Sequence, residues 1–278
     1  MGWRVKIRHV TTLEYDGKAS ASYNEVRMTP LDDGRQNTLE RRLVVRPATP
    51  IWTYTDHWGT LVGVFDLPKS HTSLTIESVS RVETSAPRPP GTSLSWKELR
   101  TVDGPVAEML RPTAQTAVSA ELASAVREKV AGMSPHEAAE AIAWDVHERV
   151  AYTPGVTGVQ THAQEVWDRA EGVCQDMSHL TVALMRAAGI PARYVSGYLH
   201  PRRDAEIGRS VVGQSHAWVE YWTGEWAALD PTNRTAAGEG HVVVARGRDY
   251  SDVPPLKGVY QGPPAEHQEV TVEMTRLA

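Results

Sequence analysis

The first third of the chain alternates between apolar and polar residues, which is typical of β-strands. The alternation is carried at first by Trp3, Val5, Ile7 and Tyr15. Similar short stretches follow at residues 39–46, 60–67 and 72–82. Proline, glycine and aspartate separate them, so residues 1–88 are predicted to form an antiparallel β-sandwich or barrel.

The pattern changes twice after this region. Residues 89–118 are rich in proline and glycine and read as a connector. From Ser119 onward apolar residues recur at helical spacing, and Ser134-Pro135 followed by Glu137 is a helix start. We therefore expect a second domain over residues 119–278. The alternating stretch 269–274 would add a C-terminal edge strand to it.

Charge and cysteine content narrow the classes of function. The chain has 29 basic and 34 acidic residues, a net charge of −5, which disfavours nucleic acid and anionic membranes as partners. One cysteine excludes an intrachain disulfide and a multi-thiolate metal site. We see neither a signal peptide nor an apolar run long enough to cross a bilayer, so a cytoplasmic location is expected. The oligomeric state stays open.

The single cysteine falls at a predicted helix start. An apolar stripe through Met177, Leu180 and Leu184 predicts a helix that begins near Cys174 and ends at Gly189. The unpaired N–H groups and positive dipole end of a helix N-terminus favour a thiolate and could stabilise an oxyanion. A free cysteine is more often a small buried hydrophobe, so a nearby base is needed to decide.

A hairpin supplies the candidate base. Residues 214–222 alternate as a strand, and a loop of Trp222-Thr223-Gly224 would pair Tyr221 with Glu225. Counting back, His216 then lies opposite Asp230, with Cβ atoms about 4.5–5.5 Å apart. An Asp carboxylate at that distance can hold an imidazole by a hydrogen bond.

Each of these residues alone has an ordinary structural explanation, but together they form a nucleophile, a general base and an orienting carboxylate. Ser215 is a poor alternative nucleophile, because strand alternation points it away from His216. A metal site built from His179, His200, His216 and Asp230 lacks regular ligand spacing.

Longer motifs surround these residues. The core contains YTPGVT from Tyr152, GVCQDMSHL, GIPARYVSGYL, SHAWVEYW, LDPTN and GRDYSDVPPLKGVYQG. The N-terminal half contains VRMTP and DHWG. With these motifs the chain resembles bacterial transglutaminase-like proteins, a family whose members are often described as cysteine proteases. Met177 and the segment Trp58-Gly59-Thr60 depart from the usual pattern of this family, but neither includes Cys174, His216 or Asp230.

The resemblance implies an α+β fold. An N-terminal β-sandwich-like domain would precede a transglutaminase-like, papain-related core, in which a cysteine-bearing helix packs on an antiparallel sheet. The family's catalytic triad carries over onto Cys174, His216 and Asp230.

The implied reaction is acyl transfer through a thioester on Cys174, with a peptide or protein as substrate and without a metal or organic cofactor. Hydrolysis is favoured; a crosslinking transglutaminase and a non-catalytic interaction module are the alternatives. Tyr152, Gln175 and Trp218 are candidate substrate contacts. The backbone N–H of Cys174 is the expected oxyanion donor, and a second donor is sought among Tyr152, Trp167 and Gln175.

Overall fold

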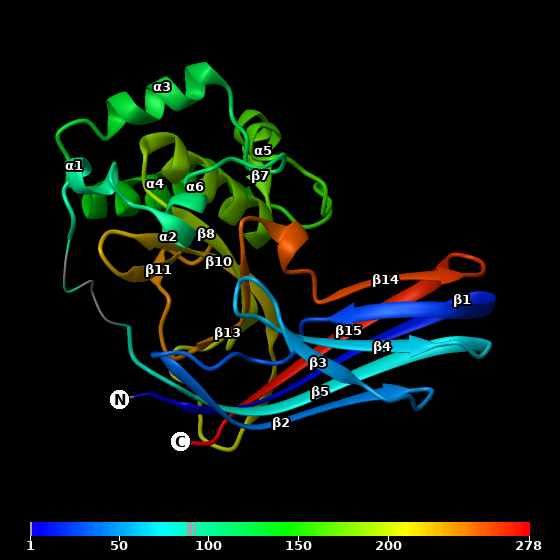
Figure 1. Ribbon diagram of the computed structural model, residues 1–278. Coiled ribbons are helices and arrows are strands. Elements are labelled where there is room, and N and C mark those ends of the chain that lie inside the picture. The colour runs from blue at the N-terminus through cyan, green and yellow to red at the C-terminus, as the bar shows by residue number, and fades with distance from the viewer. Residues whose placement is uncertain (1, 88–90, 92) are drawn as a thin grey trace.

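A computed structural model describes residues 2–87, 91 and 93–278 (Figure 1). Within them two antiparallel sheets, one of eight strands and one of five, lie against each other, and helices cover the second sheet. The fold class is thus α+β, as predicted. No helix in the described part of the chain is long and apolar enough to cross a membrane. The expected cytoplasmic location stays a prediction.

The eight-stranded sheet contains the predicted N-terminal strands. Its members are β1 (Arg4–Val26), β2 (Gln36–Arg46), β3 (Trp52–Thr55), β4 (Leu61–Leu67), β5 (His71–Thr84), β9 (Ser210–Val212), β14 (Leu256–Gln261) and β15 (Ala265–Arg276). The sheet curls over a core that includes Tyr15, Val26, Phe65 and Ile76. At the other end of β1, Val5 and Ile7 pack toward the second sheet. The alternation at the start of the sequence is therefore a buried strand face.

The C-terminal strands belong to this first sheet. β15 pairs with β1 from Val5↔Arg276 to Tyr15↔Ala265, and β14 pairs with the second half of β1. The sequence pattern had placed residues 269–274 at an edge of the 119–278 core. The alternation correctly indicates a strand there, but it carries no information about a partner more than 250 residues away. The two chain ends consequently lie close together (Figure 1).

The five-stranded sheet carries the candidate site. Its order is β12-β11-β10-β8-β13, with β8 (Ala192–Leu199), β10 (Gln214–Trp222), β11 (Trp226–Asp230), β12 (Thr235–Ala236) and β13 (His241–Gly247). A short parallel pair, β6 (Ala151–Tyr152) and β7 (Glu171–Gly172), lies beside the helices.

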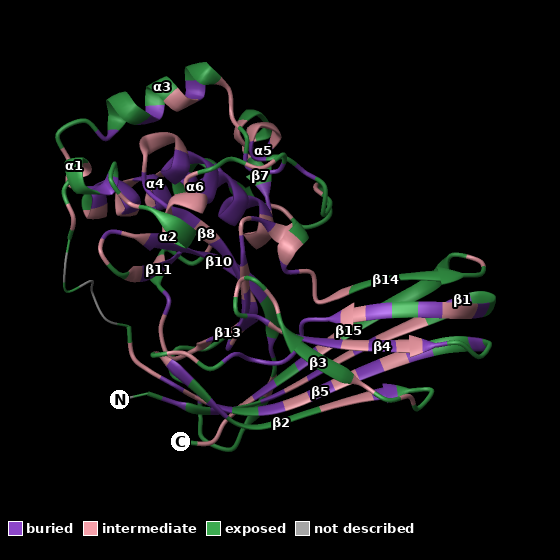
Figure 2. Cartoon of the chain, viewed as in Figure 1, coloured by how far each residue is buried: buried purple, intermediate pink, exposed green. Residues whose placement is uncertain are grey.

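The helices pack on one face of this sheet. They are α1 (Trp96–Leu99), α2 (Gly104–Glu108), α3 (Ala120–Lys129), α4 (Pro135–Arg149), α5 (Ala163–Arg169) and α6 (Cys174–Ala188), with a 3-10 turn η1 (Tyr250–Asp252). The predicted start of α4 is confirmed: the Ser134 side chain accepts from the Glu137 N–H and the Glu137 carboxylate accepts from the Ser134 N–H. Most of α6 is buried between the sheet and its neighbours (Figure 2).

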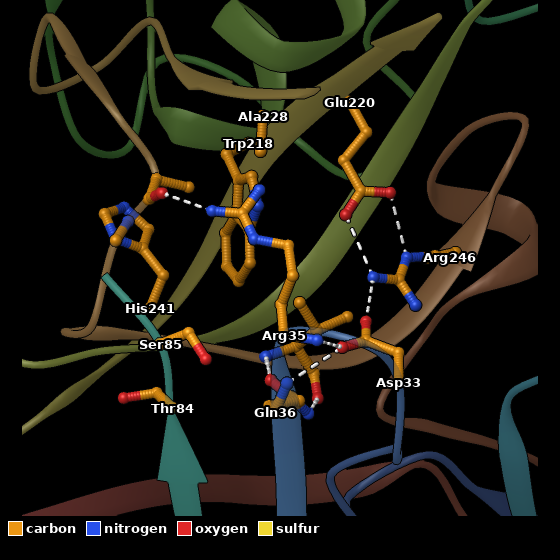
Figure 3. Close-up of a pocket in the computed structure, with 13 residues that line it drawn as sticks. Asp33, Arg35, Gln36, Thr84, Ser85, Trp218, Glu220, Ala228, His241 and Arg246 are labelled. Carbon is orange, nitrogen blue, oxygen red and sulfur yellow. Dashed lines mark hydrogen bonds and ion pairs between the residues drawn. The ribbon is translucent and has the colours of Figure 1, made fainter. Parts of the chain in front are cut away.

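A buried ionic cluster joins the two layers (Figure 3). Glu220 of β10 accepts from Arg246 Nε at 2.9 Å, and Arg246 also binds Asp33 from the loop before β2. Outside the figure, Glu220 also accepts from Arg193 Nε at 2.6 Å. Burial alone would raise the pKa of Glu220, but the two guanidinium groups outweigh it and lower the pKa to about 2. The Arg35 guanidinium reaches the Ala237 carbonyl oxygen at 3.1 Å. These contacts fix the first layer against the sheet that carries the site.

Candidate active site

Cys174 is the first residue of α6, which confirms the predicted helix boundary. The helix ends at Gly189, whose φ of +93° is readily adopted by glycine. At the N-terminus, the Asp176 carboxylate accepts from the Val173 N–H at 2.7 Å and from the Thr157 hydroxyl at 2.6 Å. This side chain secures the helix start and ties the loop after β6 to it.

His216 of β10 donates from Nε2 to Asp230 Oδ2 at 2.8 Å, and both side chains are buried. The expected contact is therefore present, but the predicted register is wrong. Tyr221 pairs with Ala227, and the loop is Thr223-Gly224-Glu225, with Gly224 at φ +115°. The pairing is shifted by two residues, which returns every side chain to the same face. Asp230 therefore reaches His216 diagonally.

The Asp230 carboxylate accepts five hydrogen bonds. Oδ2 binds His216, His241 Nε2 at 3.1 Å and Asn233 Nδ2 at 2.7 Å. Oδ1 accepts from the backbone N–H groups of Thr232 at 3.0 Å and Asn233 at 3.1 Å. Burial would raise the pKa of Asp230, but these donors outweigh burial and hold it far below its usual range. Asp230 is thus an ionised acceptor.

This network fixes the protonation pattern of His216. Because ionised Asp230 can only accept, the proton between them belongs to His216 Nε2, and Nδ1 is left for Cys174. Burial lowers the pKa of His216, whereas its interactions with Asp230 and Cys174 raise it, to a net value of about 9. The site therefore stabilises an imidazolium between the Cys174 sulfur and the carboxylate.

Cys174 and His216 open onto a groove of about 380 Å³. The groove is lined by Tyr152, Cys174, Val212, Gly213, Gln214, Ser215, His216, Val270, Thr271 and Val272. Its walls therefore come from the helical side, from the start of β10 and from β15 of the first sheet. A substrate that fills this groove would contact both layers of the protein.

Comparison with known proteins identifies the family of this chain. The model of the transglutaminase-like superfamily matches residues 121–231, and that of the bacterial transglutaminase-like N-terminal region matches residues 5–83. An uncharacterized protein of Mycobacterium leprae is 44% identical over 278 residues, covering 99% of this chain and 100% of the relative. The chain belongs to the transglutaminase-like superfamily.

Two further comparisons describe this transglutaminase-like chain. A crystal structure of a candidate cysteine protease from Cytophaga hutchinsonii matches with a TM-score of 0.80 at 23% identity, over 100% of this chain and 92% of that one. It shows that the fold is shared over the whole chain. A Pseudomonas aeruginosa protein-glutamine gamma-glutamyltransferase is 38% identical over 96 residues, which cover 32% of this chain and 14% of that protein.

The other residues singled out from the sequence lie in different surroundings. Tyr152 is about half exposed in the groove, and burial together with Cys174 raises its pKa. Gln175 does not line the groove, and its side-chain amide donates to the Gly158 carbonyl oxygen at 3.4 Å. Trp218 is fully buried and lines the small cavity in Figure 3. Trp167 packs against the helical core beneath the Arg149 guanidinium.

His241 is a member of the candidate site that the sequence did not reveal. Its Nδ1 accepts from the Gly238 N–H at 3.1 Å, so the proton lies on Nε2, which donates to Asp230. Burial lowers the pKa of His241, which keeps this ring neutral. Its strand β13 pairs with β8, so no local motif links it to Asp230. Asn233, in contrast, stands in the LDPTN motif, three residues after Asp230.

The ring nitrogens of His216 and His241 and a carboxylate oxygen of Asp230 all lie within 4.8 Å of one another. A metal ion could use such donors, yet the hydrogen bonds from both rings to Asp230 Oδ2 already account for the spacing. Of the other histidines considered from the sequence, His179 accepts from the Tyr250 N–H and His200 accepts from the Arg202 N–H. Hydrogen bonding thus describes this cluster without a metal.

Proposed function

We propose that this protein carries out cysteine-dependent acyl transfer on peptide-like amide or isopeptide bonds, with water as the main acceptor. The observation that carries the proposal is the arrangement of Cys174, His216 and Asp230, of which Cys174 and His216 line an open groove. A thiol at a helix start, a histidine beside it and a buried carboxylate behind that histidine supply a nucleophile, a general base and an orienting group.

In the first half of the reaction, the proton of Cys174 is held on His216 Nδ1, so that a thiolate faces an imidazolium. The sulfur then attacks the substrate carbonyl carbon, so that a C–S bond forms and the carbonyl oxygen becomes an oxyanion. Collapse of this intermediate breaks the C–N bond. His216 returns its proton to the departing nitrogen, which leaves as an amine or as ammonia, and a thioester remains on Cys174.

In the second half, water enters and His216 takes one of its protons. The hydroxide oxygen attacks the thioester carbonyl and the C–S bond breaks. The products are a carboxylic acid and the Cys174 thiolate beside protonated His216, which restores the starting pair. Throughout, ionised Asp230 holds the ring orientation and stabilises each imidazolium that forms.

Two groups are proposed to stabilise the oxyanion. The backbone N–H of Cys174 is one of the first in α6 and has no partner within the helix. The Tyr152 hydroxyl is the second candidate. Among Tyr152, Trp167 and Gln175, the residue that lines the groove is Tyr152. A Tyr152→Phe variant would keep the ring and remove this donor.

A crosslinking reaction is the second candidate. The similarity to the Pseudomonas aeruginosa protein-glutamine gamma-glutamyltransferase supports it. In that case a primary amine replaces water in the second half of the reaction and an amide is formed. The groove is open to solvent and could admit either acceptor.

The test is intact-mass spectrometry of glutamine-containing peptides after incubation with wild-type protein or Cys174→Ala, with and without a primary amine. A Cys174-dependent gain of water and loss of ammonia, or peptide cleavage, supports hydrolysis. A gain of the amine with loss of ammonia supports crosslinking. Circular dichroism should show the same fold for both proteins. Turnover by Cys174→Ala equal to that of the wild type would refute the proposal.

A further inference from the structure

One edge of β15 is only partly covered. β15 pairs with β1 along its length, from residue 265 to residue 276. On its other edge β9 pairs only with Glu273, Met274 and Thr275. Among the described residues, no other strand pairs with this edge. Along residues 266–271 the edge of β15 is therefore exposed to solvent.

The backbone hydrogen bonds of β15 to its neighbours show which of its N–H and C=O groups point toward the open edge. The Gly213 N–H donates to the Val272 carbonyl oxygen at 2.8 Å, so Val272 presents its backbone groups to the β9 side. In an antiparallel strand these groups alternate in direction from residue to residue. Val270 and Gln268 therefore present their N–H and C=O groups to the open edge, while Thr271 and Glu269 pair with β1.

This open edge leads into the candidate active site. Val270, Thr271 and Val272 line the same groove as Cys174 and His216. β9 runs antiparallel to β15 as far as Val212, and after Gly213 the chain turns away into β10. The groove begins at that divergence, so a strand that continued the path of β9 along β15 would pass beside Cys174. Val270, at 48% exposure, stands where the buried run of Val272 and Met274 ends.

We propose that an extended segment of the acyl-donor protein docks as an added β-strand on the open edge of β15, opposite Val270 and Gln268. This inference rests on the proposed function. Main-chain hydrogen bonds would supply affinity for extended backbone, and the groove would admit the side chain that carries the reacting carbonyl.

The shape of the edge favours a short substrate segment over a second copy of this chain. The register of β15 against β1 shifts between Glu14 and Tyr15, and such irregularities interrupt edge-to-edge pairing. Within the open stretch, Glu266 stands near one end and Glu269 lies between Gln268 and Val270. Two residues with outward-facing groups suit a peptide of about five residues, and a stable dimer usually needs a larger interface.

Two variants separate backbone from side-chain effects. Val270→Pro removes the outward N–H without removing a hydrogen bond to β1, and proline is tolerated on edge strands at such positions. Val270→Ala keeps the N–H and shortens the side chain. Thermal unfolding of both variants should stay close to that of the wild type.

The probe is the pentapeptide acetyl-Thr-Val-X-Val-Thr-amide, in which X is diaminopropionic acid with a chloroacetyl group on its side chain. The Cys174 thiolate displaces chloride, so a C–S bond forms as the C–Cl bond breaks, and intact mass gives the rate. Capped X alone carries the same reactive group without the strand. Two isomers, N-methylated on both valines or on X and the last threonine, each block one set of alternate amides.

We expect the pentapeptide to alkylate Cys174 about tenfold faster than capped X, as one or two hydrogen bonds would provide. One methylated isomer should lose this advantage and the other should keep it. Val270→Pro should lose most of it, whereas Val270→Ala should keep most of it. If Val270→Pro does not fold, the methylated pair still decides.

Equal rates for the pentapeptide and capped X, or for both isomers and the parent, would overturn the docking site. So would a wild-type dimer that Val270→Pro converts to a monomer, because the edge would then belong to a second copy. If capped X and iodoacetamide both fail to modify Cys174, the proposed function itself fails, and the docking site falls with it.

Discussion

Replacing Asp230 by asparagine tests whether this carboxylate sets the charge of His216. The pKa of His216 is about 9, because hydrogen bonding to Asp230 and interaction with Cys174 outweigh burial. Asparagine keeps the volume but removes the negative charge, and its NH₂ group cannot accept from the donors around it. We expect the pKa of His216 in Asp230→Asn to fall to 6.5 or below. At about 1.4 kcal/mol per pH unit, the lost stabilisation of the imidazolium is roughly 3 kcal/mol.

The assay is a titration of the histidine ring protons by NMR, with the His216 signal assigned from a His216→Gln variant. Alkylation of Cys174 by iodoacetamide at pH 7 should slow by up to about a hundredfold, because the thiolate loses its cationic partner. A His216 pKa that stays near 9 in Asp230→Asn would refute the reasoning. Thermal unfolding of the variant serves as the control for its fold.

The raised pKa of His216 also predicts how the stability of the protein depends on pH. The folded pKa of His216 lies above its ordinary value of 6.5. Its contribution to the free energy of unfolding is therefore complete below about pH 6.5 and is lost as the pH rises toward 9. The stability difference between wild type and Asp230→Asn should accordingly be larger at pH 6 than at pH 9.5.

Two further variants test the buried networks. Glu220→Gln leaves Arg193 and Arg246 without their buried anion and should lower the free energy of unfolding in urea at pH 7 by roughly 3–5 kcal/mol. The pKa of Glu220 is lowered to about 2, so its contribution to the free energy of unfolding is present above about pH 4.5 and is lost as the pH falls toward 2. The stabilities of wild type and Glu220→Gln should therefore converge in acid. A stability difference that stays constant with pH would contradict this assignment. His241→Phe removes one hydrogen-bond donor to Asp230 and should lower the free energy of unfolding by roughly 1.5–3 kcal/mol. His241→Gln keeps an N–H donor and should recover part of this loss. Equal stability of the two variants would exclude a hydrogen-bonding role for His241.

Local patterns predicted the elements around the site. The start of α6 at Cys174 and the capping box at Ser134 follow from helix-end chemistry that spans only a few residues. The contact of His216 with Asp230 was predicted from an incorrect register, and it is present because an error of two residues preserves the face of a strand. A register error of one residue would have separated the two side chains.

Long-range pairing could not be predicted in the same way. His241 reaches Asp230 because β13 pairs with β8, and β15 forms a wall of the groove because it pairs with β1. Neither strand carries a signal that names its partner, since alternation specifies a face and not a neighbour. Trp218 illustrates the same limit: its strand was predicted, but its burial depends on how the two layers meet.

The central claim is that Cys174 forms a thioester. The most direct measurement uses p-nitrophenyl acetate as a minimal acyl donor, an acid quench, and intact-mass and peptide-level spectrometry of the protein. The account predicts one acetyl group on Cys174, removed by neutral hydroxylamine, absent in Cys174→Ala and formed much more slowly in His216→Gln. An acetyl group that resides on another residue, or equal acetylation of wild type and Cys174→Ala, would contradict it.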